Sequence, residues 1–516
     1  METKKDLETK AKPLIKTSPD EAVMLYRRIW DEYPTQFNDW DAMFTMQALN
    51  LVQTVDFDWA VELVQKYTDE KVQGQYGWLI YNKFLKKHPR NDILRAEDWI
   101  VHLCGVVPQK NLQENATFPC PITMSVFKMV DAYTESLFNA RKVNEWLERL
   151  NPKFLSVKSL IIKTADKGDM ELASDLEKYY ALRTKALLKL NRFEDCKMLC
   201  QFGLKEITKF HYDNDLWLQM RIAIADEKMG NIAESEAQFK SLLATKAGHD
   251  KWFLHNDIAE LYFEQKDYDK ALKYAIDAAF FGNEPHFMIG LYRLQARILY
   301  GLERPDEGKV LAQLICAILK EQHWAIKAEY HKLFNFYKLD VAQIDSSKVY
   351  LKEAQTFWKA EKFGDLPLVT GEVIFIHANG KVGKIKDVNG NVIGFHRKSF
   401  VKKQKTLEDL NGATVQFIIM ESFDGNNIAE NITVVKMTEK APPHALVGKE
   451  LKGTVKNIAE FGLFIQLDEH PKGLLHKSNL PKDMRNSFQE SFHIGDVITV
   501  KIIGVTDKGL QLKLSE

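Results

Sequence analysis

The feature that most constrains the fold of this chain is a change of hydrophobic periodicity near residue 364. Before it, up to about Trp358, apolar residues recur three and four positions apart, which is the spacing of one face of an α-helix. After Gly364, short runs alternate apolar and polar residues and are bounded by Gly, Asn and Asp, as in half-buried strands. Helices followed by strands, rather than alternating with them, indicate separate domains. We therefore expect a multidomain α + β protein whose first part is all helical.

The helical part repeats itself at a nearly constant interval. Residues 252–281 contain two helical stretches joined by a turn at 265–267, with the small residues Ala259 and Ala271 where two antiparallel helices would meet. Successive small residues of this kind in the second helices are 39, 36 and 37 positions apart. A period of this length predicts stacked helix pairs that form a solenoid. The residues that define the spacing are Cys196, Ser235, Ala271 and Gly308, and nearer the start Ala22 and Ala60, which are 38 apart.

This pattern resembles the tetratricopeptide repeat, most closely in residues 256–285. The resemblance implies an α-solenoid over residues 18–362, whose concave face would bind a protein or peptide partner. Residues 70–160 fit the pattern poorly, so the register there stays open. Residues 1–17 have no apolar core, and we expect them to be disordered.

Composition narrows the class of protein. Lys plus Arg and Asp plus Glu are equal at 71 each, so no overall charge draws the whole molecule to a polyanion. The N-terminus lacks the apolar core of a secretory signal, and no apolar run approaches the roughly 20 residues that a membrane helix requires. The cysteines are scattered and odd in number, at 5, which fits a reducing compartment better than a disulfide framework. We expect a cytoplasmic protein without a membrane partner.

The part after residue 364 contains two blocks of short strands. The first block spans 367–437 and includes a hairpin turn at Asn389-Gly390, and the second spans 447–516. Between them, residues 438–446 contain Pro442-Pro443, which is typical of a linker. Each block holds about five short strands, which predicts a small five-stranded barrel of the OB type.

Alternation in the second block separates an inner face from an outer face. It points the leucines and isoleucines of each strand inward and leaves Phe464 and His476 outside, together with several lysines. Bases of single-stranded RNA stack on such exposed rings, at about 1–3 kcal/mol each, while nearby cations meet the phosphates. The outer face of this barrel is therefore a candidate RNA-binding surface.

The second block also resembles the RNA-binding domain named for ribosomal protein S1. The resemblance covers the whole block and implies a barrel that binds single-stranded RNA. A barrel used only for protein contacts is the alternative. The motifs that carry the resemblance are G-x-V-x-x-I at 453–458, F-G-x-F at 461–464, G-L-L-H-x-S at 473–478, G-D-x-[IV] at 495–498 and L-S at 514–515.

The same resemblance implies roles for single residues. Phe461, Phe464 and His476 stand where the family stacks bases, and Asp507 matches a loop aspartate near its RNA site. Gln511 stands where many members carry an arginine, so one contact to RNA is lost. The cations that we expect to meet phosphates are Lys456, Lys477 and Lys513.

The first block is similar to a cold-shock domain in strand order, with G-x-V-x-F at 371–375 and F-H at 395–396. Of that family's exposed aromatic platform, Phe375 remains. A basic run persists and predicts sequence-independent attraction to a nucleic-acid backbone, which salt weakens steeply. A spacer barrel with a solvated basic face is the alternative. The residues that we expect to contribute are Phe375, Lys384, Arg397 and Lys398.

Motifs that would predict catalysis are missing. Neither HExxH nor GxSxG occurs, and Gly380-x-x-Gly383 lacks the Lys-Ser/Thr pair of a phosphate-binding loop. Cys196 and Cys200 have His211 nearby, but no second ligand pair follows, so a buried seam of small residues explains them better than a metal site. We expect no enzyme activity, no cofactor and no metal.

Together these features predict a cytoplasmic RNA-binding adaptor. The C-terminal barrel would bind single-stranded or loop RNA, while the helical repeats bind an unidentified protein in translation, RNA decay or a stress or defence response. One alternative is a protein scaffold whose barrels dock on another protein without RNA. Another is a nuclease with an unrecognised site.

Overall fold

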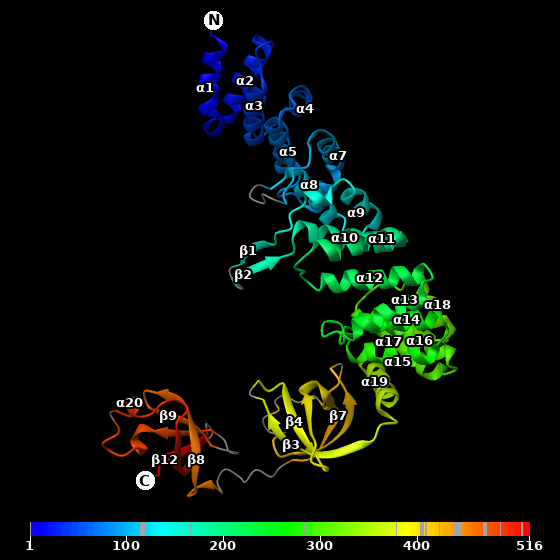
Figure 1. The fold of residues 1–516 in the computed structure, drawn as a ribbon, viewed down its shortest axis with the longest axis vertical. Helices are drawn as coiled ribbons and strands as arrows, with labels where there is room; N and C mark the ends of the chain where they lie inside the picture. The colour runs from blue at the N-terminus through cyan, green and yellow to red at the C-terminus, as the bar shows by residue number, and fades with distance from the viewer. Residues whose placement is uncertain are drawn as a thin grey trace. The chain divides into compact units, whose positions relative to one another are not determined.

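The computed structural model divides into two compact units, residues 1–364 and 365–516. Helices and one hairpin make up the described part of the first unit, and the second unit contains two β-barrels (Figure 1). This arrangement confirms the predicted order of a helical part followed by two barrels. The structure describes residues 2–113, 119–164, 168–282, 284–377, 379–402, 407, 410–422, 424–437, 446–467, 472–485, 487–506 and 509–515.

The helices of the first unit vary in length at first and then become regular. The earlier ones are α1 (Lys4–Thr17), α2 (Pro19–Glu32), α3 (Asp39–Leu51), α4 (Phe57–Lys66), α5 (Glu70–Phe84), α6 (Arg90–Arg95), α7 (Glu97–Val106), α8 (Pro121–Ala132) and α9 (Ala140–Leu147). The later ones are α10 (Asp175–Lys189), α11 (Phe193–Glu206), α12 (Asn214–Lys228), α13 (Ile232–Leu243), α14 (Trp252–Glu264), α15 (Tyr268–Phe280), α16 (Ile289–Gly301), α17 (Pro305–Glu321), α18 (Ala328–Phe336) and α19 (Ser347–Phe363). Within the described ranges, no helix has both the length and the apolar character needed to cross a bilayer.

Helices α10 to α17 form four consecutive pairs that share one kind of turn. At each turn a residue with left-handed backbone ends the first helix, and the following amide donates back to a carbonyl five residues earlier, as Asp267 N does to Tyr262 O at 3.0 Å. This C-cap satisfies carbonyl groups that a helix end leaves free. The repeated pairs confirm the predicted tetratricopeptide-like solenoid. The left-handed residues are Asn191, Gly230, Lys266 and Glu303, with φ of 58°, 87°, 62° and 58°.

The small residues that set the repeat spacing lie where paired helices touch. Gly308 on α17 shows why size matters, because a Cβ there would lie 2.3 Å from the hydroxyl of Tyr337. That hydroxyl donates to the carbonyl oxygen of Ala296 at 2.8 Å, so a larger residue at 308 would displace a buried hydrogen bond. The other small residues of the spacing are also buried, namely Ala22, Ala60, Cys196, Ser235 and Ala271.

The N-terminal residues are helical, so the predicted disorder of the first 17 residues is wrong. Helix α1 begins with a capping box in which Thr3 and Asp6 bond each other's backbone amides. Its residues Leu7, Ala11 and Ile15 lie on one face and are buried. This stripe is too sparse to recognise as an apolar core in the sequence, but it suffices because α2 packs against it.

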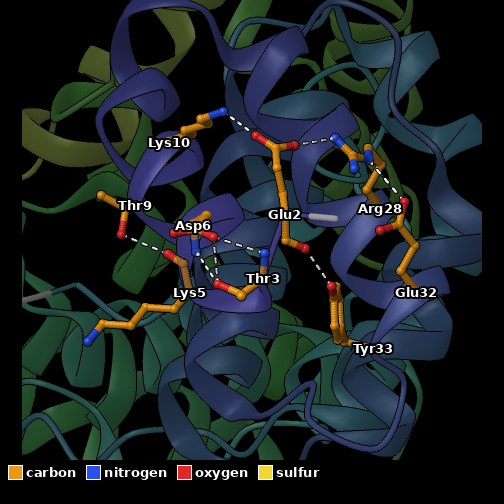
Figure 2. A network of polar contacts seen from close by, with 9 residues as sticks. All are labelled: Glu2, Thr3, Lys5, Asp6, Thr9, Lys10, Arg28, Glu32 and Tyr33. Atoms are coloured by element: carbon orange, nitrogen blue, oxygen red, sulfur yellow. Dashed lines mark hydrogen bonds and ion pairs between the residues drawn. The ribbon is translucent and has the colours of Figure 1, made fainter.

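Polar contacts hold the start of α1 against α2 (Figure 2). The carboxylate of Glu2 forms ion pairs with Lys10 and, at 3.1 Å, with Arg28. The hydroxyl of Tyr33 donates to the carbonyl oxygen of Glu2 at 2.6 Å, and Arg28 also pairs with Glu32 at 3.1 Å. The N-terminal helix is thus an integral part of the solenoid.

A β-hairpin interrupts the helices between α9 and α10, where the spacing predicted helix alone. Strands β1 (Leu160–Thr164) and β2 (Gly168–Leu172) pair antiparallel, with Ile162 opposite Met170, and project from the neighbouring helices (Figure 1). The β-branched run Ile-Ile-Lys-Thr favours a strand over a helix. Just before the hairpin, helices α5 to α9 range from 6 to 15 residues, which explains why residues 70–160 have no regular period.

The second unit contains two five-stranded closed barrels with the same strand order. In each, the third and fifth strands pair parallel and all other neighbours pair antiparallel. This connectivity is that of the predicted OB-type barrel. The middle barrel comprises β3 (Leu368–Ile376), β4 (Val382–Asp387), β5 (Val392–His396), β6 (Thr414–Glu421) and β7 (Asn427–Lys436). The C-terminal barrel comprises β8 (Glu450–Ala459), β9 (Gly462–Leu467), β10 (Gly473–His476), β11 (Val497–Thr506) and β12 (Gly509–Leu514).

The core of the C-terminal barrel is formed by the side chains that alternation points inward. Val455, Leu463 and Leu512 are fully buried in it. Gly453 lies on the same inner face, where a Cβ would come within 2.4 Å of Ile465 Cγ2. Leu446, which was assigned to the linker, is also buried in this core, so the barrel begins one residue earlier than predicted. The rest of the predicted linker, residues 438–445, lies outside the described residues.

Candidate nucleic-acid interface

The two phenylalanines of the F-G-x-F motif lie together on the outer side of the C-terminal barrel. Phe461 is 45% exposed at the turn between β8 and β9, and Phe464 is half-buried on β9. Their ring centroids are 6.0 Å apart and the ring planes are nearly perpendicular, at 82°. The inward positions Leu463 and Ile465 are fully buried, so the predicted alternation of β9 is confirmed. The two rings therefore pack edge to face.

Gly462 allows β9 to lie close to β10 at this point. Its φ is 156°, and a Cβ there would come within 2.4 Å of the carbonyl oxygen of Leu475. The register places Gly462 opposite His476, and the amide of Lys477 donates to the carbonyl oxygen of Phe461 at 2.9 Å. The close approach brings Phe461 beside His476 and Lys477, on the same side of the barrel as Phe464.

His476 is held in one orientation by Ser478. The backbone amide of Ser478 lies 3.2 Å from Nδ1 of the imidazole, and the Ser478 hydroxyl lies 2.8 Å from the same nitrogen. An amide N–H can only donate, so Nδ1 accepts in the neutral ring and the ring proton lies on Nε2. The half-buried imidazole therefore presents an N–H donor from the end of β10.

The three predicted lysines are exposed around these rings. Lys456 lies at an irregularity of β8, between Val455 and Asn457. Lys477 directly follows His476, and Lys513 follows the last pair of the parallel β10–β12 ladder, Leu475 with Leu512. Of the three, Lys477 lies directly beside Phe461, and Lys456 precedes Asn457, the residue that pairs with Phe464. The predicted loop residue Asp507 lies outside the described residues.

The register of the strands adds residues that the sequence did not identify. Across the barrel, Phe464 pairs with Asn457 on β8 and with Leu474 on β10, and Leu474 pairs with Gln511 on β12. The side chains of these four residues form one row on the outer side of the barrel. A base stacked on Phe464 would lie over this row. Strict alternation would have turned Asn457 inward, but the irregularity after Val455 turns it outward, where it is exposed.

The predicted residues of the middle barrel lie on a different kind of surface. Phe375 is 46% exposed and pairs with Lys384, which in turn pairs with Gly394. Arg397 and Lys398 are exposed in the short turn that follows β5. The structure therefore places Lys384 beside Phe375, and no second exposed phenylalanine lies beside that ring among the described residues of this barrel.

The residues considered for a metal site are engaged elsewhere. Cys196 and Cys200 are buried, and the Cys196 thiol donates to the carbonyl oxygen of Thr184 at 3.3 Å. His211 binds the buried carboxylate of Glu177, with 2.8 Å between Nδ1 and the carboxylate oxygen. Across the part of the chain that the structure describes, no three His, Cys, Asp or Glu side chains come together in a metal-binding arrangement.

Comparison with known proteins identifies one part of the chain. A polyribonucleotide nucleotidyltransferase from a Geobacter species is 28% identical over 180 residues, 34% of this chain and 24% of that relative. One from Deinococcus deserti is 37% identical over 65 residues, 13% of this chain and 9% of the relative, so the chain spans at most about a quarter of either. A tetratricopeptide repeat protein from Parabacteroides merdae aligns with 65% of this chain and 99% of its own, at a TM-score of 0.32 and 15% identity. Residues 446–515 match the family model of the S1 RNA binding domain, and the C-terminal barrel is therefore an S1 RNA-binding domain.

Proposed function

We propose that this protein is an RNA-binding adaptor that performs no chemistry itself. Its S1 domain would bind single-stranded or loop RNA while its helical repeats bind a protein. The observation that carries the proposal is the outer face of the S1 domain, where Phe461, Phe464 and His476 lie together with exposed lysines. An exposed ring on a barrel strand is costly in water and is used when a partner covers it.

Stacking is the main source of affinity in this proposal. Because the planes of Phe461 and Phe464 are 82° apart, a base lying on one ring meets the other edge-on rather than being sandwiched. Each stacked base contributes about 1–3 kcal/mol and is tolerated whatever its sequence. Recognition would therefore favour unpaired RNA, whose bases can turn outward, over a duplex.

Polar contacts would orient the strand on this platform. The Nε2 proton of His476 can be donated to a phosphate oxygen or to an acceptor on a base. Lys456, Lys477 and Lys513 supply charge to the backbone, so binding would weaken as salt rises. Gln511 in the row beneath the platform can bond a base edge but adds no charge.

The second arm of the proposed adaptor is the solenoid. Stacked helix pairs offer large surfaces for protein recognition, and two modest sites on one chain raise overall avidity without new contacts. All five cysteines are free thiols, which supports a role in the reducing cytoplasm, in translation, RNA decay or a stress or defence response.

The test replaces Phe464 and His476 with Ala together in the full chain. We expect the dissociation constant for a single-stranded RNA to rise at least about tenfold, since a stacking ring and a donor are lost. The matched control replaces Phe287, an exposed ring on the solenoid, and its half-buried neighbour His286 with Ala, and should leave RNA binding unchanged. Circular dichroism checks that both variants are folded.

Two outcomes would contradict the proposal. An unchanged dissociation constant in the Phe464→Ala, His476→Ala variant, with negligible RNA binding at physiological salt and a co-purifying protein, would favour a protein scaffold. Metal-dependent turnover of RNA by the purified wild-type protein would instead establish an enzyme.

A further inference from the structure

Helices α17 and α19 line an open cavity of about 430 Å³ on the first unit. Its floor is apolar and is formed by Val310 of α17 with Ala354, Phe357 and Ala360 of α19. Tyr350, Ala354 and Trp358 form the buried stripe of α19, and Phe357 lies beside this stripe, half-buried, where its ring also lines the cavity.

Carboxylates surround the apolar floor. Asp306 and Glu307 lie in the first turn of α17, and Glu353 lies on α19. Arg304 neutralises Glu307 at 2.9 Å and also binds Glu361 at 2.6 Å. Within the described residues, Asp306 and Glu353 form no ion pair. The rim therefore retains uncompensated negative charge.

The cavity already holds one guanidinium group at its edge. Arg304 lies over the ring of Phe357, with 5.7 Å between its guanidinium carbon and the ring centroid, while its nitrogens bind carboxylates. A guanidinium group suits this environment because it is planar, weakly hydrated and able to stack on a ring and bond a carboxylate at once. An ammonium group has a stronger hydration shell and lacks the flat face.

We propose that this cavity is a docking site for an arginine-bearing segment of a protein partner. The aliphatic stem of the arginine would lie on Val310 and Ala360, its guanidinium would stack on Phe357, and Asp306 and Glu353 would accept its hydrogen bonds. This inference rests on the proposed role of the solenoid as the protein-binding arm. It specifies where on that arm the partner binds and by what chemistry.

The experiment measures fluorescence anisotropy of a labelled tetra-arginine peptide with the full chain. Replacing Asp306 and Glu353 with Lys should weaken binding about tenfold, because the rim then repels the peptide. The matched control replaces Glu194 and Glu234, exposed residues in the first turns of α11 and α13, with Lys and changes the net charge equally. It should shift the affinity less than about twofold.

A second variant tests the ring without altering charge. Phe357→Leu should weaken tetra-arginine about threefold and leave a tetra-lysine peptide nearly unaffected, because a guanidinium stacks on the ring better than an ammonium does. Equal losses in the rim and control variants, equal affinity for the two peptides, or no binding of tetra-arginine would each overturn the proposal.

The RNA-binding proposal is tested separately in the same proteins. The Asp306→Lys, Glu353→Lys variant should bind single-stranded RNA as the wild type does, and the Phe464→Ala, His476→Ala variant should keep its affinity for tetra-arginine. A failure of one proposal is therefore visible without a failure of the other.

Discussion

In the middle barrel, strand register joins Phe375, Lys384, Gly394 and Ile428 in one row of paired residues on neighbouring strands. The row at the same place in the S1 domain consists of Asn457, Phe464, Leu474 and Gln511. Both rows start at an irregularity in the first strand, after Val373 in one barrel and after Val455 in the other. By this register, a lysine in the middle barrel occupies the place of the central phenylalanine of the S1 domain.

The inner faces of the two barrels differ much less. Gly371 and Gly453 occupy matching places in the first strands, and Ile385 and Ile465 are fully buried on the second strands. The comparison teaches that the scaffold and the surface are separable. A closed sheet needs small and apolar residues on its inner side. The outer side can carry either aromatic rings for stacking or a group of basic side chains.

The largest effect is expected from enlarging the glycine that both scaffolds share. Gly453→Val should unfold the S1 domain and abolish RNA binding, because a Cβ there would lie 2.4 Å from Ile465 Cγ2, and overpacking of a core costs about 1–3 kcal/mol or more. Gly371→Val should destabilise the middle barrel alone. Hydrogen exchange of each barrel's strands measures both effects. Gly394→Ala, which meets no atom within 4 Å, is the tolerated control. Equal exchange in Gly453→Val and wild type would contradict a common scaffold.

The next effect comes from exchanging the central residues of the two rows. Phe464→Lys should weaken binding of single-stranded RNA at least about tenfold, since a stacking surface is lost. The reciprocal Lys384→Phe should strengthen binding about fivefold at roughly 0.3 M salt, because salt weakens charge attraction to the phosphates more than it weakens stacking. Titration by fluorescence anisotropy measures both. If Lys384→Phe instead weakens binding at this salt concentration, a ring at this place in the middle barrel does not stack on a base.

The cations of the middle barrel should determine salt dependence rather than selectivity. Lys384→Gln with Lys398→Gln should lower the slope of log affinity against log salt by about 1.4, since each cation that meets a single strand contributes about 0.7 to the slope. The same change at Lys273 and Lys309, exposed lysines of the solenoid, should leave the slope unchanged. Equal slopes in all three proteins would mean that the middle barrel is a spacer.

A smaller gain is expected at Gln511 of the S1 domain. Its carboxamide lies on the outer side, where a Cβ added to Gly504 would be 2.9 Å from Oε1. Gln511→Arg should tighten RNA binding about threefold at low salt, because it adds one charged contact beside Leu474. Gln511→Glu, measured in parallel, should weaken binding. A lower RNA affinity of the Gln511→Arg variant would show that RNA does not pass over Gln511.

The smallest effect is a pH response of the middle barrel. The Asn391 side chain and the backbone amides of Asn391 and Asn389 donate to Asp387 and lower its pKa below the ordinary value. Because the folded pKa is the lower one, Asp387 stabilises the barrel above the unfolded pKa, and this contribution is lost as pH falls through the folded pKa. Asp387→Asn should therefore destabilise the barrel slightly at neutral pH and equal the wild type in strong acid. Hydrogen exchange of β4 and β5 measures the difference.

Much of the candidate interface could be predicted from local patterns. Alternation alone placed Phe464 and His476 outside and Leu463 inside, because each barrel strand has one buried and one wet face. The position of Asn457 could not be predicted, since an irregularity in β8 reverses the alternation at one residue. Helix α1 was missed for another reason: its stripe of Leu7, Ala11 and Ile15 becomes a core only when α2 covers it.

The sequence by itself determined the class of every large segment: a 3.6-residue period before residue 364, a two-residue period after it, and the order of motifs that marks an S1 domain. Such patterns are local and survive in the unfolded chain. The tertiary structure alone decided which residues share a row of the barrel, how Ser478 orients His476, and that α17 and α19 leave a cavity with a charged rim. These features arise from strand register and helix packing between residues far apart in the chain, where a shift of one position exchanges the neighbours of every side chain.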